Sequence, residues 1–517
     1  MGNLSRALAG RQIDPYIQIL MRGWRSIAGI GRAMLRGATL AALVAFAPYP
    51  ASAQQDFLTD FILPEAEAKK LAEAEHPKIV AAFGGEYRDP ALAKYVSSIA
   101  TYLGLVSARP YITYRITILN SPVVNAFALP AGYIYVTRGL LALADNEAQL
   151  AGVIAHEIGH VTARHTAQRY SRTLLAQGIL GLLGAMTQGS TMEGLADLAE
   201  PIALVALQSY SREHENEADQ LAVRFMANAG YNPRGMSGFL KKMEANEGLE
   251  GALSGQGDAP AQLDLFATHP RTAARVEQTI AAAGGLQVNQ PMTERALYLG
   301  KIDGILYGDD PEQGFVRGRV FSHPGLDLRF EAPPDFHLVN GQEQVTARGP
   351  QGAFMEFVLG PEPWSGSMRD YLLRVWAKGV SLHNIESIDV NGFAAATATA
   401  RVEQQGQAID IRIAAIRGER GAIYRLLYAA PPGQMGRLDP NFRDSVFSFR
   451  RMTWQEKQSL RPYRLEVREL RPGESYVELA SQLPYRDERL RRFRVLNGLS
   501  PSDWARPGDL VKLVVED

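Results

Sequence analysis

The sequence predicts a multidomain α+β protein, with a mainly helical unit containing a small β-sheet, then an antiparallel α/β sandwich domain, then a small βααβ module. Three observations predict this class. The chain has 517 residues, too many for one ordinary hydrophobic core. Apolar residues recur at helical spacing in residues 57–105 and again beyond residue 145, whereas strand-like alternation dominates after residue 315. Residues 463–515 begin and end with strand-like runs that flank helical ones.

Composition and charge exclude several classes of protein. Hydrophobic residues make up 46% and charged residues 21% of the chain, as in ordinary globular proteins. The formal net charge is -1, so the basic excess of a nucleic-acid-binding protein is missing and no such partner is expected. The chain has no cysteine, which excludes a disulfide scaffold and fits an exported protein. Any metal must therefore be bound by histidine and carboxylate side chains.

Residues 1–53 have the three parts of a secretory signal peptide. The apolar run ATLAALVAFA follows Arg22, Arg25, Arg32 and Arg36, and an A-x-A site ends at Ala53. The run is too short to span a bilayer, and no cysteine follows the site that could carry a lipid anchor. We therefore expect cleavage after Ala53 and a mature protein in the periplasm. A retained amphipathic anchor is the alternative.

The first folded unit is predicted to span residues 54–290. Short strand-like runs lead into a long helix, for which Asp145 or Asn146 is the expected N-cap. A thirteen-residue apolar run at 174–186 favours a core helix or interfacial contact over a membrane span, and residues 253–262 have the composition of a flexible loop. The strand-like runs lie at residues 114–119, 125–130 and 132–139.

The stretch IAHEIGHVTARH, residues 154–165, holds three of the nine histidines of the chain. His156 and His160 are spaced i, i+4, so their imidazoles lie on one helix face and can bind one metal ion. Glu157 is one position further round and can reach a water on that ion. We therefore predict His156 and His160 as zinc ligands and Glu157 as the general base. His165 lies about 140° round the helix from His160 and is predicted to be a surface or capping histidine.

A catalytic zinc site usually has a third protein ligand and leaves its fourth position to water. We predict Glu215 as the third ligand, because Glu215 and Asp219 are again spaced i, i+4 on a helix that would pack beside the first. Asp219 is then placed to accept the free ring N–H of a ligand histidine. His214 and Glu217 are alternative ligands, but both point away from the face shared by Glu215 and Asp219.

These motifs resemble metallopeptidase family forty-eight of the M class, the gluzincin group of HtpX-type membrane proteases, CAAX prenyl proteases and periplasmic BepA-type proteases. The resemblance covers roughly residues 60–285, and family members often have two glycines where this chain has Ala131-Gly132. Because no transmembrane helices flank the motifs, the sequence is similar to the soluble periplasmic branch. The matching stretches are His156-Glu157-x-x-His160, Ser211-Arg212 before Glu215-x-x-Ala218-Asp219, and NAFALPAGYIYVTRGLL at 125–141.

The resemblance implies a mainly helical gluzincin-type catalytic domain and a metalloendopeptidase with one Zn²⁺ per chain. Zinc would polarise the scissile carbonyl and lower the pKa of a bound water, whose proton Glu157 would take and pass to the leaving amine. The strand around Asn125, Ala126 and Phe127 would pair with an extended substrate peptide. Unfolded or extended segments are therefore the expected substrates.

One further segment, Thr268-His269-Pro270, is similar to a segment of BepA-type relatives that brings a histidine to the zinc. By this resemblance His269 is a candidate reversible fourth ligand, and Arg275 is a candidate for steadying the oxyanion. Alternatively, His269 is a histidine at a helix start that packs under the catalytic domain.

The C-terminal half contains two more predicted domains. Residues 315–452 combine alternating strands with one helical stretch, a pattern loosely similar to the PsbP/Mog-type sandwich, and we expect a docking role for substrates or partners. Residues 462–517 resemble a LysM module at VLNGLS (495–500) and at Pro507-Gly508-Asp509. Because such modules commonly bind glycans with N-acetylglucosamine, peptidoglycan is an expected partner. A purely structural module is the alternative.

Taken together, these features predict a zinc endopeptidase of the bacterial cell envelope that hydrolyses unfolded or misassembled proteins in quality control. The expected partners are polypeptide substrates, peptidoglycan, and the membrane or outer-membrane assembly machinery. A chaperone-like assembly factor with a latent zinc site and a peptidoglycan-tethered binding protein are the alternatives. Glu157 favours the enzyme, because a scaffold has no use for a general base.

Overall fold

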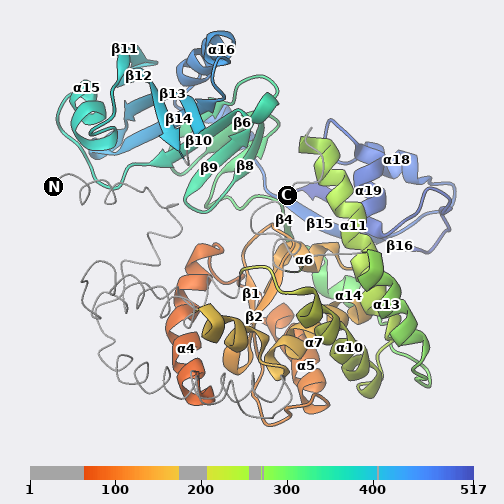
Figure 1. The fold of residues 1–517 in the computed structure, drawn as a ribbon. Helices are drawn as coiled ribbons and strands as arrows, with labels where there is room; N and C mark the ends of the chain where they lie inside the picture. Colours follow the sequence, from red (N-terminus) through yellow and green to blue (C-terminus); the bar gives the residue numbers. More distant parts are fainter. Residues whose placement is uncertain (1–62, 174–206, 255–268, 270–272, 405–406) are drawn as a thin grey trace, which may run out of the picture.

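The computed structural model describes residues 63–173, 207–254, 269, 273–404 and 407–517 (Figure 1). Helices surround a small sheet in the first unit, and a seven-stranded sheet dominates the middle of the chain, which confirms the predicted mixture of helices and sheets. Within these residues, no helix has the length and apolar character needed to cross a membrane. The predicted signal peptide, the apolar run at 174–186 and most of the predicted loop at 253–262 lie outside the described residues.

Helix α7 (Glu147–Thr162) is the centre of the first unit, because every one of its residues is buried. Its N-cap is Asn146, whose side chain accepts a hydrogen bond from the backbone N–H of Gln149 at 2.9 Å. Four neighbouring helices pack against it, namely α5 (Pro90–Leu105), α10 (Arg212–Asn228), α11 (Arg234–Ser254) and α14 (Arg295–Ile302). The first unit also contains α4 (Glu65–Ala82), α6 (Arg138–Leu143) and α13 (Ala273–Gly284), of which α13 packs on α10 and α11.

Two glycines of α7 allow the neighbouring helices to approach closely. A Cβ atom at Gly159 would lie 3.1 Å from the carbonyl oxygen of Ala218 in α10, and one at Gly152 would lie 2.9 Å from the Cα of Met236 in α11. A larger residue at either position would push these helices away from α7. The sequence thus brings α10, with its acidic residues, against the histidines of α7.

A three-stranded sheet lies beside α7, with β3 (Tyr133–Thr137) between β1 (Arg115–Leu119) and β2 (Ala126–Leu129). β1 is parallel and β2 antiparallel to β3, so β2 is an edge strand, and it contains two of the three predicted substrate-strand residues, Ala126 and Phe127. The third, Asn125, precedes the strand and is buried with it. The hydroxyl of Thr166 donates to the carbonyl of Ala128 in β2 at 3.4 Å.

The middle of the chain forms an antiparallel sheet of order β11-β12-β13-β14-β10-β9-β8, with α16 (Met435–Phe447) and a short helix α15 (Met368–Tyr371) packed on it. A small sheet of β5 (Phe315–Arg317), β6 (Val320–His323) and β7 (Leu328–Glu331) adjoins it. The strands of the large sheet are β8 (His337–Asn340), β9 (Gln344–Arg348), β10 (Phe354–Leu359), β11 (His383–Val390), β12 (Phe393–Gln404), β13 (Gln407–Arg417) and β14 (Ile423–Ala430).

The C-terminal module has the predicted order of strand, helix, helix and strand. β15 (Tyr463–Glu469) pairs antiparallel with β16 (Leu510–Glu516), and α18 (Tyr476–Ser481) and α19 (Arg489–Asn497) lie between them in sequence. β15 also pairs with β4 (Leu306–Tyr307), which follows the first unit. Assignment of the module to the LysM type remains a prediction, as does the division of the chain into domains.

Candidate metal centre

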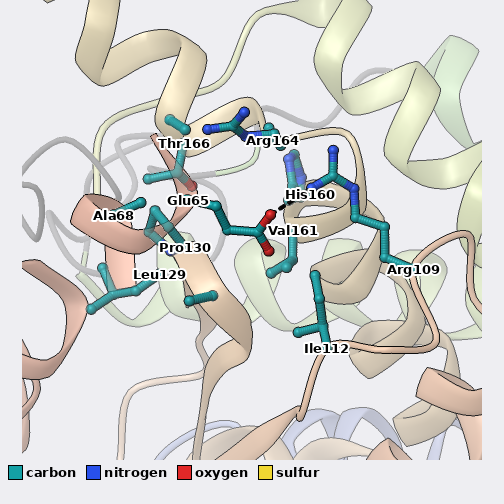
Figure 2. A pocket seen from close by; sticks show the side chains of 12 residues that line it. Glu65, Ala68, Arg109, Ile112, Leu129, Pro130, His160, Val161, Arg164 and Thr166 are labelled. Atoms are coloured by element: carbon teal, nitrogen blue, oxygen red, sulfur yellow. Dashed lines mark ion pairs between the residues drawn. The ribbon is translucent and has the colours of Figure 1, made fainter. Parts of the chain in front are cut away.

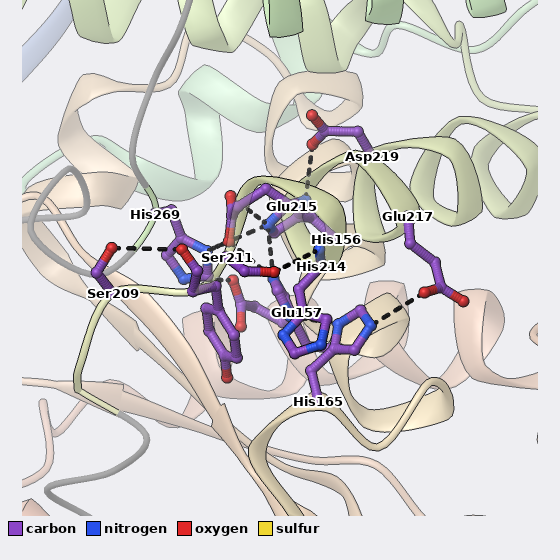
Figure 3. Close-up of polar contacts among 12 residues, drawn as sticks. His156, Glu157, His165, Ser209, Ser211, His214, Glu215, Glu217, Asp219 and His269 are labelled. Atoms are coloured by element: carbon purple, nitrogen blue, oxygen red, sulfur yellow. Dashed lines mark hydrogen bonds and ion pairs between the residues drawn. The ribbon is translucent and has the colours of Figure 1, made fainter. Parts of the chain in front are cut away.

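Four buried side chains bring possible ligand atoms together in the first unit (Figure 3). His156 and His160 come from α7, Glu215 comes from the first turn of α10, and His269 precedes α13. One nitrogen or oxygen atom of each residue lies within 4.8 Å of all the others. The i, i+4 spacing of the two histidines and the approach of α10 at Gly159 bring the predicted residues together. His269 adds a fourth atom.

The distances among these atoms fit a tetrahedral zinc ion. Zinc bonds of about 2.0–2.1 Å place neighbouring ligand atoms roughly 3.3 Å apart. The Nε2 atom of His156 lies 3.0 Å from Nε2 of His160 and 3.3 Å from Nδ1 of His269. The Oε1 atom of Glu215 lies 3.4 Å from Nε2 of His160 and 2.9 Å from Nδ1 of His269. Three imidazoles and one carboxylate are also a donor set that zinc accepts.

Asp219 and Arg275 hold two of these residues in place. The Nδ1 atom of His156 lies 2.9 Å from Asp219, which is where the helical spacing predicts this carboxylate. Arg275 donates to both oxygens of Asp219, at 2.8 and 2.9 Å, and lies 2.5 Å from Oε2 of Glu215. Burial alone would lower the pKa of His156, but the hydrogen bond and charge of Asp219 reverse this and raise it. Arg275 was predicted to steady the oxyanion, whereas in the structure its guanidinium group contacts the carboxylates of Asp219 and Glu215.

His165 is not a surface histidine, so this prediction was wrong. Its side chain is 1% exposed, and its Nδ1 atom lies 2.9 Å from Nδ1 of His160. Its other nitrogen lies 3.3 Å from a carboxylate oxygen of Glu217, and its ring stacks on that of His214 at 4.2 Å. His214 and Glu217, the two alternative ligands, therefore surround His165, which contacts a candidate ligand. Burial, reinforced by the charge of His214, lowers the pKa of His165 to about 3.

The misplacement of His165 has a local cause. α7 ends at Thr162, and Arg164 adopts a left-handed conformation with φ of 58°. The chain therefore turns before His165, and the angle extrapolated along a continuous helix does not apply. No glycine or asparagine marks this helix end in the sequence, although these residues are the usual signals for a left-handed turn.

Tyr210 belongs to the centre, although no motif in the sequence predicted a role for it. Its ring stacks on that of His160 with the centroids 3.9 Å apart, and its hydroxyl lies 2.7 Å from that of Thr166. Burial raises the pKa of Tyr210 to about 12, so it stays protonated at neutral pH. The only available signal was its position directly before the Ser211-Arg212 motif.

Glu157 differs from every other acidic group at the centre. It is 0% exposed, and neither of its carboxylate oxygens has a hydrogen-bond partner among the residues described. The Nε2 atom of His269 lies 3.5 Å from its Oε1. Burial raises the pKa of Glu157 above its ordinary value. The carboxylate lines a pocket whose other walls are largely apolar, with Val153, Met236, Phe239, Leu240 and Met243.

A second pocket lies beside His160, at the end of β2 (Figure 2). Glu65 and Arg109 line it, with the Oε2 and Nη1 atoms 3.8 Å apart. The remaining lining residues are mainly apolar and include Ile112, Leu129, Pro130 and Val161.

Comparison with known proteins connects this centre with peptidases. Residues 87–282 match Peptidase family M48. The Beta-barrel assembly-enhancing protease of Escherichia coli (strain K12) is 32% identical over 162 residues, which are 30% of this chain and 33% of that protein. Mitochondrial metalloendopeptidase OMA1 of Arabidopsis thaliana is 35% identical over 31% of this chain and 29% of that protein. OMA1 of Schizosaccharomyces pombe is 27% identical, over 41% and 59% respectively. The chain thus spans about a third of the length of the first of these relatives.

Proposed function

We propose, because residues 87–282 match Peptidase family M48, that this chain is a zinc-dependent endopeptidase of the bacterial cell envelope. The proposal depends mainly on the environment of the Glu157 carboxylate. A buried carboxylate without a hydrogen-bond partner in the described structure costs free energy, so its presence beside four possible metal ligands supports a role in chemistry.

Each residue of the centre would have a distinct role in peptide hydrolysis. His156, His160 and Glu215 would hold the zinc ion, which when bound polarises the scissile carbonyl and lowers the pKa of a water. Glu157 accepts a proton from that water and delivers it to the leaving amine. Its raised pKa suits both transfers, because a carboxyl group closer to neutrality binds and releases a proton more evenly. Asp219 fixes the orientation of His156.

The substrate would be an extended polypeptide that adds to the edge strand β2. Ala126 and Phe127 lie in this edge strand, whereas the backbone N–H and C=O of Asn125 are already bonded to Thr137 of β3, so Asn125 would add no backbone hydrogen bond to the peptide. The apolar pocket at Glu157 would take an apolar side chain next to the cleaved bond. Folded proteins rarely expose such segments, so unfolded or misassembled proteins are the proposed substrates. Thr166 contacts the carbonyl of Ala128 and would release it when the peptide binds.

His269 would be a reversible fourth ligand that keeps the resting enzyme closed. Its Nδ1 atom lies 3.3 Å from Nε2 of His156 and 2.9 Å from Oε1 of Glu215, where it would take the zinc position that a reacting water needs. Replacing His269 with Ala should therefore raise the rate of proteolysis at unchanged zinc content. Unchanged or lost activity in a zinc-loaded His269→Ala protein would contradict this regulation.

The cell-envelope setting rests on other parts of the chain. The predicted signal peptide supports a periplasmic location, and similarity to a protein named for β-barrel assembly supports outer-membrane assembly machinery as a partner. The βααβ order of residues 463–516 supports a LysM-like module that binds peptidoglycan. Co-sedimentation of the full-length protein with peptidoglycan sacculi would test this partner, and failure to sediment would remove it.

A comparison of wild type with Glu157→Gln on casein, with zinc measured in both proteins, tests the enzymatic proposal. We expect one zinc per chain in each and cleavage by wild type that is about 10²–10⁴-fold faster, the usual contribution of a general acid–base group. If both proteins contain zinc and neither cleaves, even with His269→Ala added, the second candidate gains. That candidate is a chaperone-like assembly factor with a latent site, which is favoured by the presence of His269 beside the three predicted ligands.

A further inference from the structure

The C-terminal module inserts a lysine into the interior of the first unit. Lys512 of β16 is 0% exposed. Its ammonium group donates to the backbone carbonyls of Ala142, Leu143 and Ala144, at 3.0, 3.0 and 2.8 Å, and lies 3.1 Å from Oδ1 of Asp145. These four acceptors belong to the last two residues of α6 and the two residues after it, directly before Asn146, the N-cap of α7. The module therefore contacts the chain immediately before the helix that carries His156 and Glu157.

Two more cations converge on Asp145 and link the module to other helices. Lys242 of α11 donates to Oδ1 of Asp145 and, at 2.8 Å, to the carbonyl of Leu496 in the module. Arg295 of α14 donates to the carbonyl of Asp145 at 2.9 Å and to that of Leu510 at 3.1 Å. Each of these side chains bridges the start of α7 and the module.

Apolar packing joins the same two parts. Leu465, Leu479 and Phe493 of the module are buried in one continuous hydrophobic core with residues of α6 and α7. The strand pairing of β15 with β4 adds a backbone connection between them. A module that served only as a flexible tether would not need a shared core or buried lysines, because isolating those charges is costly.

The same contacts reach the walls around Glu157. Lys242 is followed directly by Met243, which lines the apolar pocket with Glu157 and with Met236 at the start of α11. The N-terminal end of α7 is fixed through Asp145, and Glu157 lies further along that helix. The module therefore contacts groups that hold α7, which carries Glu157, and α11, which lines the pocket beside Glu157.

We propose that residues 463–517 are a positioning element of the peptidase, in which Lys512 and Lys242 clamp α7 and α11 in the geometry that Glu157 requires. Lys512 and Lys242 are positioning residues, because they act through Asp145 and the two helices. The predicted effect of the module on catalysis rests on the proposed endopeptidase function. The attachment of the module to the first unit does not depend on that function. Two experiments separate these points.

The first experiment cuts the chain without removing the module. A site for a specific protease is placed between Gln458 and Ser459, which are exposed and precede β15. After cleavage of the folded full-length protein, we expect the C-terminal fragment to co-elute with the rest in gel filtration, and casein cleavage to persist. Separation of the fragment from a remainder that keeps wild-type activity would overturn the proposal. Co-elution decides the attachment even if no form of the protein cleaves casein, which would refute only the proposed function.

The second experiment replaces Lys512 with Met, which has a similar length and no charge. We expect kcat per zinc-loaded chain to fall about tenfold with KM and zinc content unchanged, because the helix is displaced rather than the metal lost. Lys457→Met is the matched control, since Lys457 pairs with Asp327 at 2.8 Å outside the first unit and should leave kcat unchanged. A lower melting temperature with wild-type kcat would show a merely structural lysine and overturn the proposal. If Lys512→Met does not fold, the cleavage experiment decides.

Discussion

Two charged clusters are associated with α7, one before its first turn and one along its second half, and they differ in how their acids are paired. At the first, the carboxylate of Asp145 is 6% exposed and has Lys242 and Lys512 as partners. At the second, the carboxylate of Glu157 is completely buried and has no hydrogen-bond partner in the part of the chain that the structure describes. A buried carboxylate with ion-pair partners can have a structural role. A buried carboxylate without a hydrogen-bond partner lowers stability, which suggests that it has a chemical role.

The pKa values of the two acids follow this difference. Burial would raise the pKa of Asp145, but the charges of Lys242 and Lys512 outweigh it and leave the pKa lowered. Burial also raises the pKa of Glu157, and the nearby His269 and His156 do not cancel the effect. The same helix thus holds one carboxylate that stays charged and one that readily accepts a proton.

Removing the paired charge should have the largest effect on stability. Asp145→Asn leaves buried lysines without their counter-charge, and we expect the free energy of unfolding to fall by about 3–5 kcal/mol. Urea unfolding followed by circular dichroism measures this change. The matched control is Glu386→Gln, which breaks a surface pair with Arg443 and should cost about 0–1 kcal/mol. Equal effects of the two variants would show that the Asp145 cluster is not the architectural one.

Removing a partner of a candidate ligand should have an intermediate effect. His165→Phe keeps a ring against His214 but deletes the nitrogen beside Nδ1 of His160. We expect zinc affinity to fall about 10–100-fold, or about 1.4–2.7 kcal/mol. Competition with a chromogenic chelator measures the affinity, and His337→Phe at an exposed position is the control. An affinity equal to that of the control would remove His165 from the support of the centre.

Neutralising the unpaired charge should have the smallest effect on stability and the opposite sign. In the metal-free protein, Glu157→Gln should raise the free energy of unfolding by about 1 kcal/mol at neutral pH, because a buried carboxylate without a hydrogen-bond partner in the described structure becomes a neutral amide. The folded-state pKa lies above the ordinary 4.5, so the gain should be absent below about pH 4.5, grow as the pH rises towards the folded-state value and stay constant above it. Urea unfolding between pH 4 and pH 8 tests this. A loss of stability at neutral pH would contradict it.

The contrast also shows what local sequence can reveal. The i, i+4 spacings of His156 with His160 and of Glu215 with Asp219 fixed their helix faces, and the structure brings these faces together. Arg275 contacts Asp219 across 56 residues of sequence, and Lys512 contacts Ala142 across 370, which no short pattern encodes. The misplacement of His165 came from a helix end without a sequence signal. Residues that act locally were predictable, whereas those that join distant segments required the fold.

The proposed chemistry depends on His156, His160, Glu215 and His269 binding one zinc ion together, and X-ray absorption at the zinc edge can identify these ligands. For the full-length resting protein we expect one zinc per chain with three imidazole nitrogens and one carboxylate oxygen at about 2.0–2.1 Å. The His269→Ala protein should keep its zinc and show two imidazoles. A wild-type protein that binds no zinc, or a spectrum that His269→Ala leaves unchanged, would contradict the account.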